Sequence, residues 1–212
     1  MSRSEQRIPK LRTRGRENRR RLLSEAERLL LENHGRPLKF SDVFEAAGVS
    51  RGSAYRIYIG IDDLMQDLAT EWINNFVEFI EASEPADPPE TWAQLSDFFV
   101  RKGAEYWEQT ADTMRVLPRV RSSAPASYSS AVRAMSNCLS DMINRYFVVP
   151  EMSGWYSKIA FYTQICDITF ADAVRSDGYI SEQRITEAAT LCRTYLAFYL
   201  PTWLPARSQP DA

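Results

Sequence analysis

The sequence has little histidine, cysteine or glycine, and each shortage excludes a kind of site. His34 is the only histidine, and the three cysteines, Cys138, Cys166 and Cys192, are far apart in the chain. No group of residues therefore has the spacing of a zinc or haem site, and the odd number of cysteines argues against a disulfide framework. With eight glycines in 212 residues, no glycine-rich loop is present that could cradle a phosphate. We expect no metal, no cofactor and no enzymatic activity.

The isolated histidine and the cysteines have simple structural interpretations. His34 stands just before Gly35, where it can cap the C-terminus of a helix. The three cysteines occupy apolar positions of predicted helices, which is typical of buried thiols; redox sensing is the alternative.

Long apolar runs are also missing. No stretch approaches the ~20 apolar residues of a transmembrane helix, and the arginine-rich start of the sequence has no apolar segment of the kind found in signal peptides. We therefore expect a cytoplasmic protein without a membrane partner. At 212 residues, the chain is long enough for one or two globular domains.

The net charge of −2 conceals a strong asymmetry along the chain. Residues 1–60 contain 14 lysines and arginines against 7 acidic residues, whereas residues 61–212 contain 12 against 21. Nine of the basic residues lie within the first 21 positions. A basic N-terminal segment on an acidic body favours nucleic acid or an anionic membrane surface as the partner. A solvated tail that only aids solubility is the alternative.

Apolar positions recur at helical spacing along nearly the whole sequence, and no segment alternates with the period of a β-strand. We therefore predict an all-α fold of about nine helices. Ser41, Ser50 and Ser181 are expected N-caps, and Thr91 with Gln94 has the pattern of a capping box. The predicted helices span residues 16–33, 41–47, 50–58, 61–82, 92–109, a shorter piece to 120, 125–147, 153–176 and 182–199.

Residues 41–58 have the pattern of a helix-turn-helix. Gly48 separates two short capped helices, and small apolar side chains from Val43 to Ala54 can pack them together. The second helix has no carboxylate from Ser50 to Tyr58. An ordinary helical hairpin of a bundle, the alternative interpretation, would have a continuous apolar face and acidic residues there.

The side chains of this second helix are suited to DNA. Its arginines, serines and tyrosines can donate hydrogen bonds to base edges and phosphates, while Gly52 and Ala54 allow close approach. The predicted DNA-binding residues are Ser41, Ser50, Arg51, Gly52, Ser53, Ala54, Tyr55, Arg56 and Tyr58.

Further motif residues surround this segment: Arg20–Leu23, Ala26, Leu29–Leu30, Gly35 and Asp62–Met65. Together with Ala-Gly-Val-Ser-Arg-Gly-Ser-Ala-Tyr at 47–55, they resemble the N-terminal domain of the TetR family of bacterial transcriptional regulators. The resemblance covers about 55 residues. Ile57 and Ile61 depart from it, because the family usually has histidine and lysine there, and the missing lysine removes one expected phosphate contact.

The resemblance implies an α-helical homodimer that binds a palindromic operator in double-stranded DNA, with each third helix in a major groove. It also implies a C-terminal domain that holds a small-molecule effector and a repressor that this effector releases. An activator, or a regulator that needs a co-repressor, is the alternative on the same fold. The expected parts are a flexible basic arm at 1–15, a DNA-binding domain at 16–60, a connecting helix at 61–82, an effector-binding and dimerisation domain at 83–204 and a tail at 205–212.

The last two predicted helices have enough apolar surface for a dimer interface in a four-helix bundle. Packing of the same faces within one subunit is the alternative. The residues of these faces are Trp155, Ile159, Tyr162, Cys166 and Phe170, followed by Ile185, Ala188, Cys192, Tyr195 and Tyr199.

Aromatic and methionine residues lie on the helices that line the effector cavity in this family, and such a wall suits an apolar or aromatic ligand. Ordinary core packing is the alternative at each position. Gln164 and the nearby Asp167 could each orient a ligand, bridge the dimer or face water. The candidate ligand-binding residues are Phe99, Tyr106, Trp107, Met114, Met142, Phe161, Tyr162, Gln164 and Ile165, with Met135 and Phe170 nearby.

Two other classes of function remain as alternatives. A membrane-surface protein would use the basic segment, but this segment lacks the bulky apolar face of an interfacial helix. A helical enzyme would use the C-terminal cavity and turn over its bound ligand.

Overall fold

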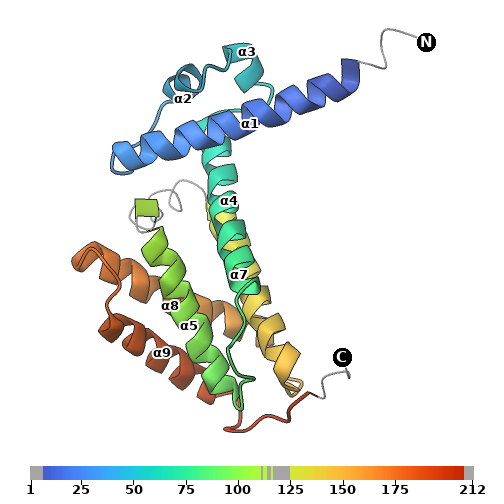
Figure 1. Ribbon diagram of the computed structural model, residues 1–212, viewed down its shortest axis with the longest axis vertical. Helices are drawn as coiled ribbons and strands as arrows, with labels where there is room; N and C mark the ends of the chain where they lie inside the picture. Colours follow the sequence, from blue (N-terminus) through green and yellow to red (C-terminus); the bar gives the residue numbers. More distant parts are fainter. Residues whose placement is uncertain (1–6, 111, 114–115, 117–124, 208–212) are drawn as a thin grey trace. The chain divides into compact units, whose positions relative to one another are not determined.

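The computed structural model describes residues 7–110, 112–113, 116 and 125–207. Eight α-helices lie within these ranges (Figure 1), and the β-type pairing among the described residues is an isolated bridge between Phe147 and Ala206. The all-α fold class is therefore confirmed. The shorter helical piece expected before residue 120 lies mostly outside the described residues. The helices are α1 (Arg7–Glu32), α2 (Phe40–Ala46), α3 (Arg51–Ala54), α4 (Ile61–Glu81), α5 (Trp92–Gln109), α7 (Pro125–Tyr146), α8 (Trp155–Ser176) and α9 (Glu182–Ala197).

The chain divides into two compact units. The first comprises residues 1–71 and 116–128, and the second comprises residues 72–115 and 129–212. The division falls inside α4, which begins in the first unit and ends in the second. Among the helices of the described ranges, none has the length and apolar character that crossing a bilayer requires.

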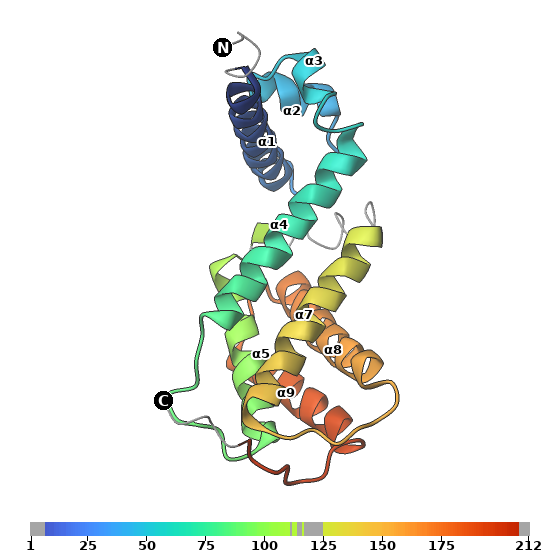
Figure 2. The same ribbon diagram turned by 90° about the vertical axis from the view of Figure 1, so that its right-hand side faces the viewer.

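In the first unit, α1 packs against both α2 and α3 (Figure 2). Leu22, Ala26 and Leu30 follow one another at steps of four along α1 and are buried, as the helical period requires for a core-facing stripe. Gly48 separates α2 from α3 with a φ of +59°, a left-handed conformation that glycine adopts without strain. The helix-turn-helix predicted from the sequence is therefore present.

α1 begins at Arg7 rather than at Arg16, so the flexible arm predicted for residues 1–15 is helical from Arg7 onward. Pro9 is compatible with this start because it lies in the first turn, where a backbone N–H has no partner within the helix. Residues 1–6 lie outside the described residues.

The N-cap predicted at Ser41 is wrong. α2 begins one residue earlier, at Phe40, with the extended Lys39 in the cap position and no side-chain cap. Ser41 therefore lies inside the first turn, and its hydroxyl donates a hydrogen bond to the carboxylate of Asp42 at 3.0 Å.

The other predicted caps are confirmed. The hydroxyl of Ser50 accepts a hydrogen bond from the backbone of Ser53, and the hydroxyl of Ser181 accepts one from the backbone of Arg184. Both bonds of the capping box between Thr91 and Gln94 are also formed before α5.

In the second unit, α9 packs against both α8 and α5. The interior contains most of the residues that the sequence assigned to a dimer face, so for these residues that assignment is wrong. The buried members are Ile159, Tyr162, Cys166 and Phe170 on α8, and Ile185, Ala188 and Cys192 on α9. These faces pack within one subunit because α8 and α9 turn them toward each other and toward α5.

Candidate functional site

α3 presents a short polar surface supported by buried neighbours. The cap from Ser50 starts the helix, Ala54 is completely buried beneath it, and the amide of Tyr58 still donates to the carbonyl of Ala54 at 3.0 Å. The helical path of the chain therefore extends beyond the four residues of α3 itself. Ser50, Arg51, Gly52 and Arg56 are exposed, and Ser53 is half-buried.

Tyr55 joins this surface to the core. Its side chain is 49% exposed, and its ring centroid lies 5.1 Å from that of Phe40 and 6.4 Å from that of Phe44. The guanidinium of Arg51 lies 5.6 Å from the centre of the Tyr55 ring. One side of the ring is thus fixed by α2, while the rest is accessible to a partner.

Two of the predicted DNA-binding residues are not on this surface. Ala54 is buried, and Tyr58 is 4% exposed. The hydroxyl of Tyr58 donates a hydrogen bond to Asp67 Oδ2 at 2.5 Å. Both side chains therefore have structural roles, and the accessible members of the predicted set are the residues from Ser50 to Ser53, Tyr55 and Arg56, with Ser41 half-buried at the start of α2.

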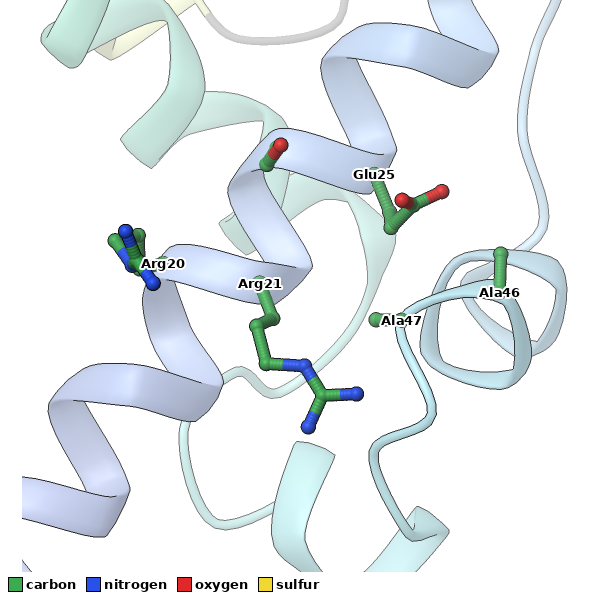
Figure 3. A pocket seen from close by; sticks show the side chains of 6 residues that line it. Arg20, Arg21, Glu25, Ala46 and Ala47 are labelled. Carbon is green, nitrogen blue, oxygen red and sulfur yellow. The ribbon is translucent and has the colours of Figure 1, made fainter.

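A second basic feature, which the sequence pattern does not indicate, lies between α1 and the end of α2. It is a hollow of about 310 Å³ lined by Arg20, Arg21, Ser24, Glu25, Ala46 and Ala47 (Figure 3). Arg20 pairs with Glu17, and Glu25 pairs with Arg28, whereas no carboxylate in the described part of the chain forms an ion pair with Arg21. The side chain of Arg21 extends from α1 toward the turn at Gly48 (Figure 3).

The candidate ligand-binding residues of the second unit fall into two groups. Phe99, Tyr106, Trp107, Met142 and Tyr162 are buried. Three of their rings surround Phe76, with centroid distances of 6.3 Å to Phe99, 5.3 Å to Tyr106 and 5.7 Å to Trp107. Met114 lies outside the described residues.

The buried aromatic group borders a hollow at Trp107. The hollow has a volume of about 190 Å³ and is lined by Trp107, Glu108, Val174, Tyr179 and Ile180. Of these residues, only Trp107 belongs to the predicted ligand-binding set.

The second group lies on the outer surface of α8. Phe161 is 51% exposed and contacts the Tyr195 ring of α9 at a centroid distance of 5.1 Å. Gln164 and Ile165 are half-buried on the same side. Asp167 is 7% exposed, so it does not face water. The structure therefore separates Phe161, Gln164 and Ile165 from the buried members of the predicted ligand-binding set.

No family model matches the chain, and no curated protein matches its sequence. Solved structures match over most of its length. A TetR-family regulator from Streptomyces coelicolor has a TM-score of 0.66 at 19% identity, covering 86% of this chain and 99% of its own. A TetR regulator from Rhodococcus sp. RHA1 has a TM-score of 0.66 at 14% identity, covering 87% and 98%. FadR from Bacillus subtilis, in complex with stearoyl-CoA, has a TM-score of 0.57 at 15% identity, covering 84% and 97%.

The chain has the fold of the TetR-family transcriptional regulators. The matched proteins are regulators rather than enzymes. The first turn of α4 carries no basic side chain in this chain. It begins with Ile61, and the exposed carboxylates of Asp62 and Asp63 follow. Exposed cations at the helix-turn-helix are instead Lys39 at the N-cap of α2, Arg51 on α3 and Arg56 just after it, and the guanidinium of Arg21 on α1 lies next to the Gly48 turn.

Proposed function

We propose that the protein is a sequence-specific DNA-binding transcriptional regulator, a repressor that binds a palindromic operator as a homodimer. The observation that supports this most strongly is the exposed surface of α3. It presents Arg51, Tyr55 and Arg56 without any carboxylate from Ser50 to Tyr58, on a helix-turn-helix whose other face is buried. Side chains of these types donate hydrogen bonds to base edges and phosphates in the major groove.

The homodimer is supported by an exposed apolar stripe on α8 and α9. Phe161 and Ile168 are seven residues apart on α8, so they lie on one side of this helix. Leu191 on α9 and Phe198, the C-cap residue of α9, are also seven residues apart. Their exposed fractions range from 51% to 80%. The Phe161 and Tyr195 rings are in contact across the two helices, so the two stripes form one surface. Such a surface is the kind that pairs with a second copy in a four-helix bundle.

The effector in this proposal is a small apolar or aromatic molecule that binds in the second unit. The hollow at Trp107 is lined by the rings of Trp107 and Tyr179, by two aliphatic side chains and by one carboxylate, that of Glu108, which suits such a molecule. Trp107 also stacks on Phe76 of the buried aromatic group. The FadR structure in complex with stearoyl-CoA is an example of a ligand held by a protein of this fold. By linkage, an effector that weakens operator binding must itself bind less tightly to the operator complex.

The test is a selection of duplexes from a randomised library by the purified protein, followed by affinity measurement on the selected duplex. Arg56→Ala is expected to weaken this affinity by about 1–3 kcal/mol. Arg175→Ala, which removes an exposed arginine of α8, is the charge-matched control and should bind like the wild type. A protein that enriches no sequence, or an Arg56→Ala variant with wild-type affinity, would contradict the proposed function.

A further inference from the structure

The chain that leaves α3 is fastened to α4 by two carboxylates. The backbone N–H of Ile59 donates to Asp63 Oδ2 at 3.0 Å, and the hydroxyl of Tyr58 donates to Asp67 Oδ2 at 2.5 Å. Asp63 and Asp67 are four residues apart and therefore lie on the same face of α4. Since α3 has only four residues, its own hydrogen bonds cannot make it stable, and its orientation depends on such contacts.

Arg19 extends this attachment to α1. Its Nε and Nη2 atoms donate to the two carboxylate oxygens of Asp67, each at 2.7 Å, in a bidentate arrangement. Burial alone would raise the pKa of Asp67, but the hydrogen bonds from Arg19 and Tyr58 outweigh it and hold this pKa below its usual value. We call Arg19, Tyr58 and Asp67 the Asp67 cluster. The cluster connects α1, the end of α3 and α4 within the first unit.

The guanidinium of Arg19 and the hydroxyl of Tyr58 could otherwise bind DNA, but both are held by Asp67 in this cluster. The charge of Arg19 is compensated by Asp67, and the ring of Tyr58 is 4% exposed, with its hydroxyl on the same carboxylate. Burial and the bond to Asp67 both raise the pKa of Tyr58, so the hydroxyl remains a donor at neutral pH. We therefore expect Tyr58, with its ring buried and its hydroxyl held by Asp67, to affect DNA binding through the position of α3.

We propose that Asp67 is a positioning residue that holds α3 in the orientation needed for operator binding, an inference that rests on the function proposed above. Whether removal of Asp67 weakens or strengthens DNA binding distinguishes a positioning role from a purely electrostatic one. An acidic residue in a DNA-binding unit repels phosphates, so its removal by itself would strengthen binding. If Asp67 acts by orienting α3, its removal weakens binding instead.

The experiment compares Asp67→Asn with Asp62→Asn on the duplex that the wild-type protein selects from a randomised library. Asp62 is exposed in the first turn of the same helix, so its substitution removes the same charge and serves as the control. Asp67→Asn is expected to bind about tenfold more weakly, the equivalent of about 1.4 kcal/mol, whereas Asp62→Asn binds as tightly as the wild type or more so. Wild-type or tighter binding by Asp67→Asn overturns the proposal.

Tyr58→Phe provides a second variant that keeps the buried ring and removes only the hydroxyl. It should weaken binding in the same direction as Asp67→Asn, and the two changes together should cost less than their sum because they break the same hydrogen bond. The slope of log affinity against log salt should stay that of the wild type, since no phosphate contact is lost. A slope reduced by about 0.9 would instead mean that the cluster contacts a phosphate.

Amide hydrogen exchange without DNA separates this proposal from the function on which it rests. The amides of Ile57 and Tyr58 both donate to the carbonyl of Ala54, and they should exchange about tenfold faster in Tyr58→Phe and Asp67→Asn than in Asp62→Asn. Unchanged exchange overturns the positioning role even where the wild type binds its duplex. A wild-type protein that selects no duplex overturns the proposed function and with it the role of Asp67 in operator binding.

Discussion

Replacing Tyr55 by alanine should weaken both the folded state and DNA binding, because the ring has a packed side and an accessible side. Its centroid lies 5.1 Å and 6.4 Å from those of Phe40 and Phe44, and 49% of the residue is exposed. Truncating a fully buried aromatic ring to alanine costs about 3–5 kcal/mol. A ring that is half-buried should therefore contribute about 2 kcal/mol to the free energy of unfolding.

Tyr55→Phe and Arg56→Ala separate the two roles of this surface. Tyr55→Phe keeps the contacts with α2 and removes only the hydroxyl, and Arg56→Ala removes an exposed guanidinium. Both variants should unfold like the wild type while binding the selected duplex more weakly, by about 1–3 kcal/mol for each lost base contact. Urea unfolding followed by circular dichroism gives the stability, and fluorescence anisotropy with a labelled duplex gives the affinity.

Two results would refute this reasoning. A Tyr55→Ala variant that unfolds at the same urea concentration as the wild type would mean that the ring is not held by Phe40 and Phe44. Wild-type affinity in both Tyr55→Phe and Arg56→Ala would mean that α3 does not contact DNA through these side chains.

The remaining predictions concern the dimer, the effector and the turn. Ile168 is 65% exposed on the α8 stripe of the proposed dimer, so Ile168→Glu should be monomeric in analytical ultracentrifugation. Thr190→Glu adds the same charge at an exposed position of α9 outside the stripe and should remain dimeric; a dimeric Ile168→Glu variant contradicts the proposed interface. Trp107→Ala should abolish the loss of operator affinity that an effector causes and leave affinity without effector intact, as titrations with and without effector would show. Gly48→Ala should lower the free energy of unfolding by about 1–3 kcal/mol, because a side chain is strained at its φ of +59° and the new Cβ would lie 2.8 Å from Arg21 Nη2, which must move. Gly52→Ala should not lower it, because the new Cβ would meet no neighbouring group within 4 Å. Equal stability of both variants refutes this account.

Local interactions along the chain could be predicted from the sequence because they involve residues within four positions of one another. The caps at Ser50 and Ser181 and the capping box at Thr91 depend on one side chain and the amide three residues later. Helix α5 has the predicted bounds, because its apolar period, its cap and the preceding prolines all agree. The error at Ser41 has the same local origin, since a shift of one residue moves a serine from the cap into the first turn.

Contacts between distant segments decided what the sequence left open. The Asp67 cluster joins residues 48 and 9 positions apart, and the bond from Trp92 Nε1 to the carbonyl of Pro201 joins residues 109 positions apart. Neither is visible in a helical pattern, because the period of a helix shows which residues share a face but not what that face meets.

The consecutive aromatic residues Phe161 and Tyr162 show this limit most directly. The sequence makes α8 apolar on two sides, so either side could form the core. In the folded chain Tyr162 is completely buried with its hydroxyl 2.9 Å from that of Ser96, whereas Phe161 is 51% exposed beside Tyr195. The amino-acid sequence by itself determined that α8 is a helix with two apolar faces, and only its packing against α5 and α9 decided which face is the core and which is left for a partner.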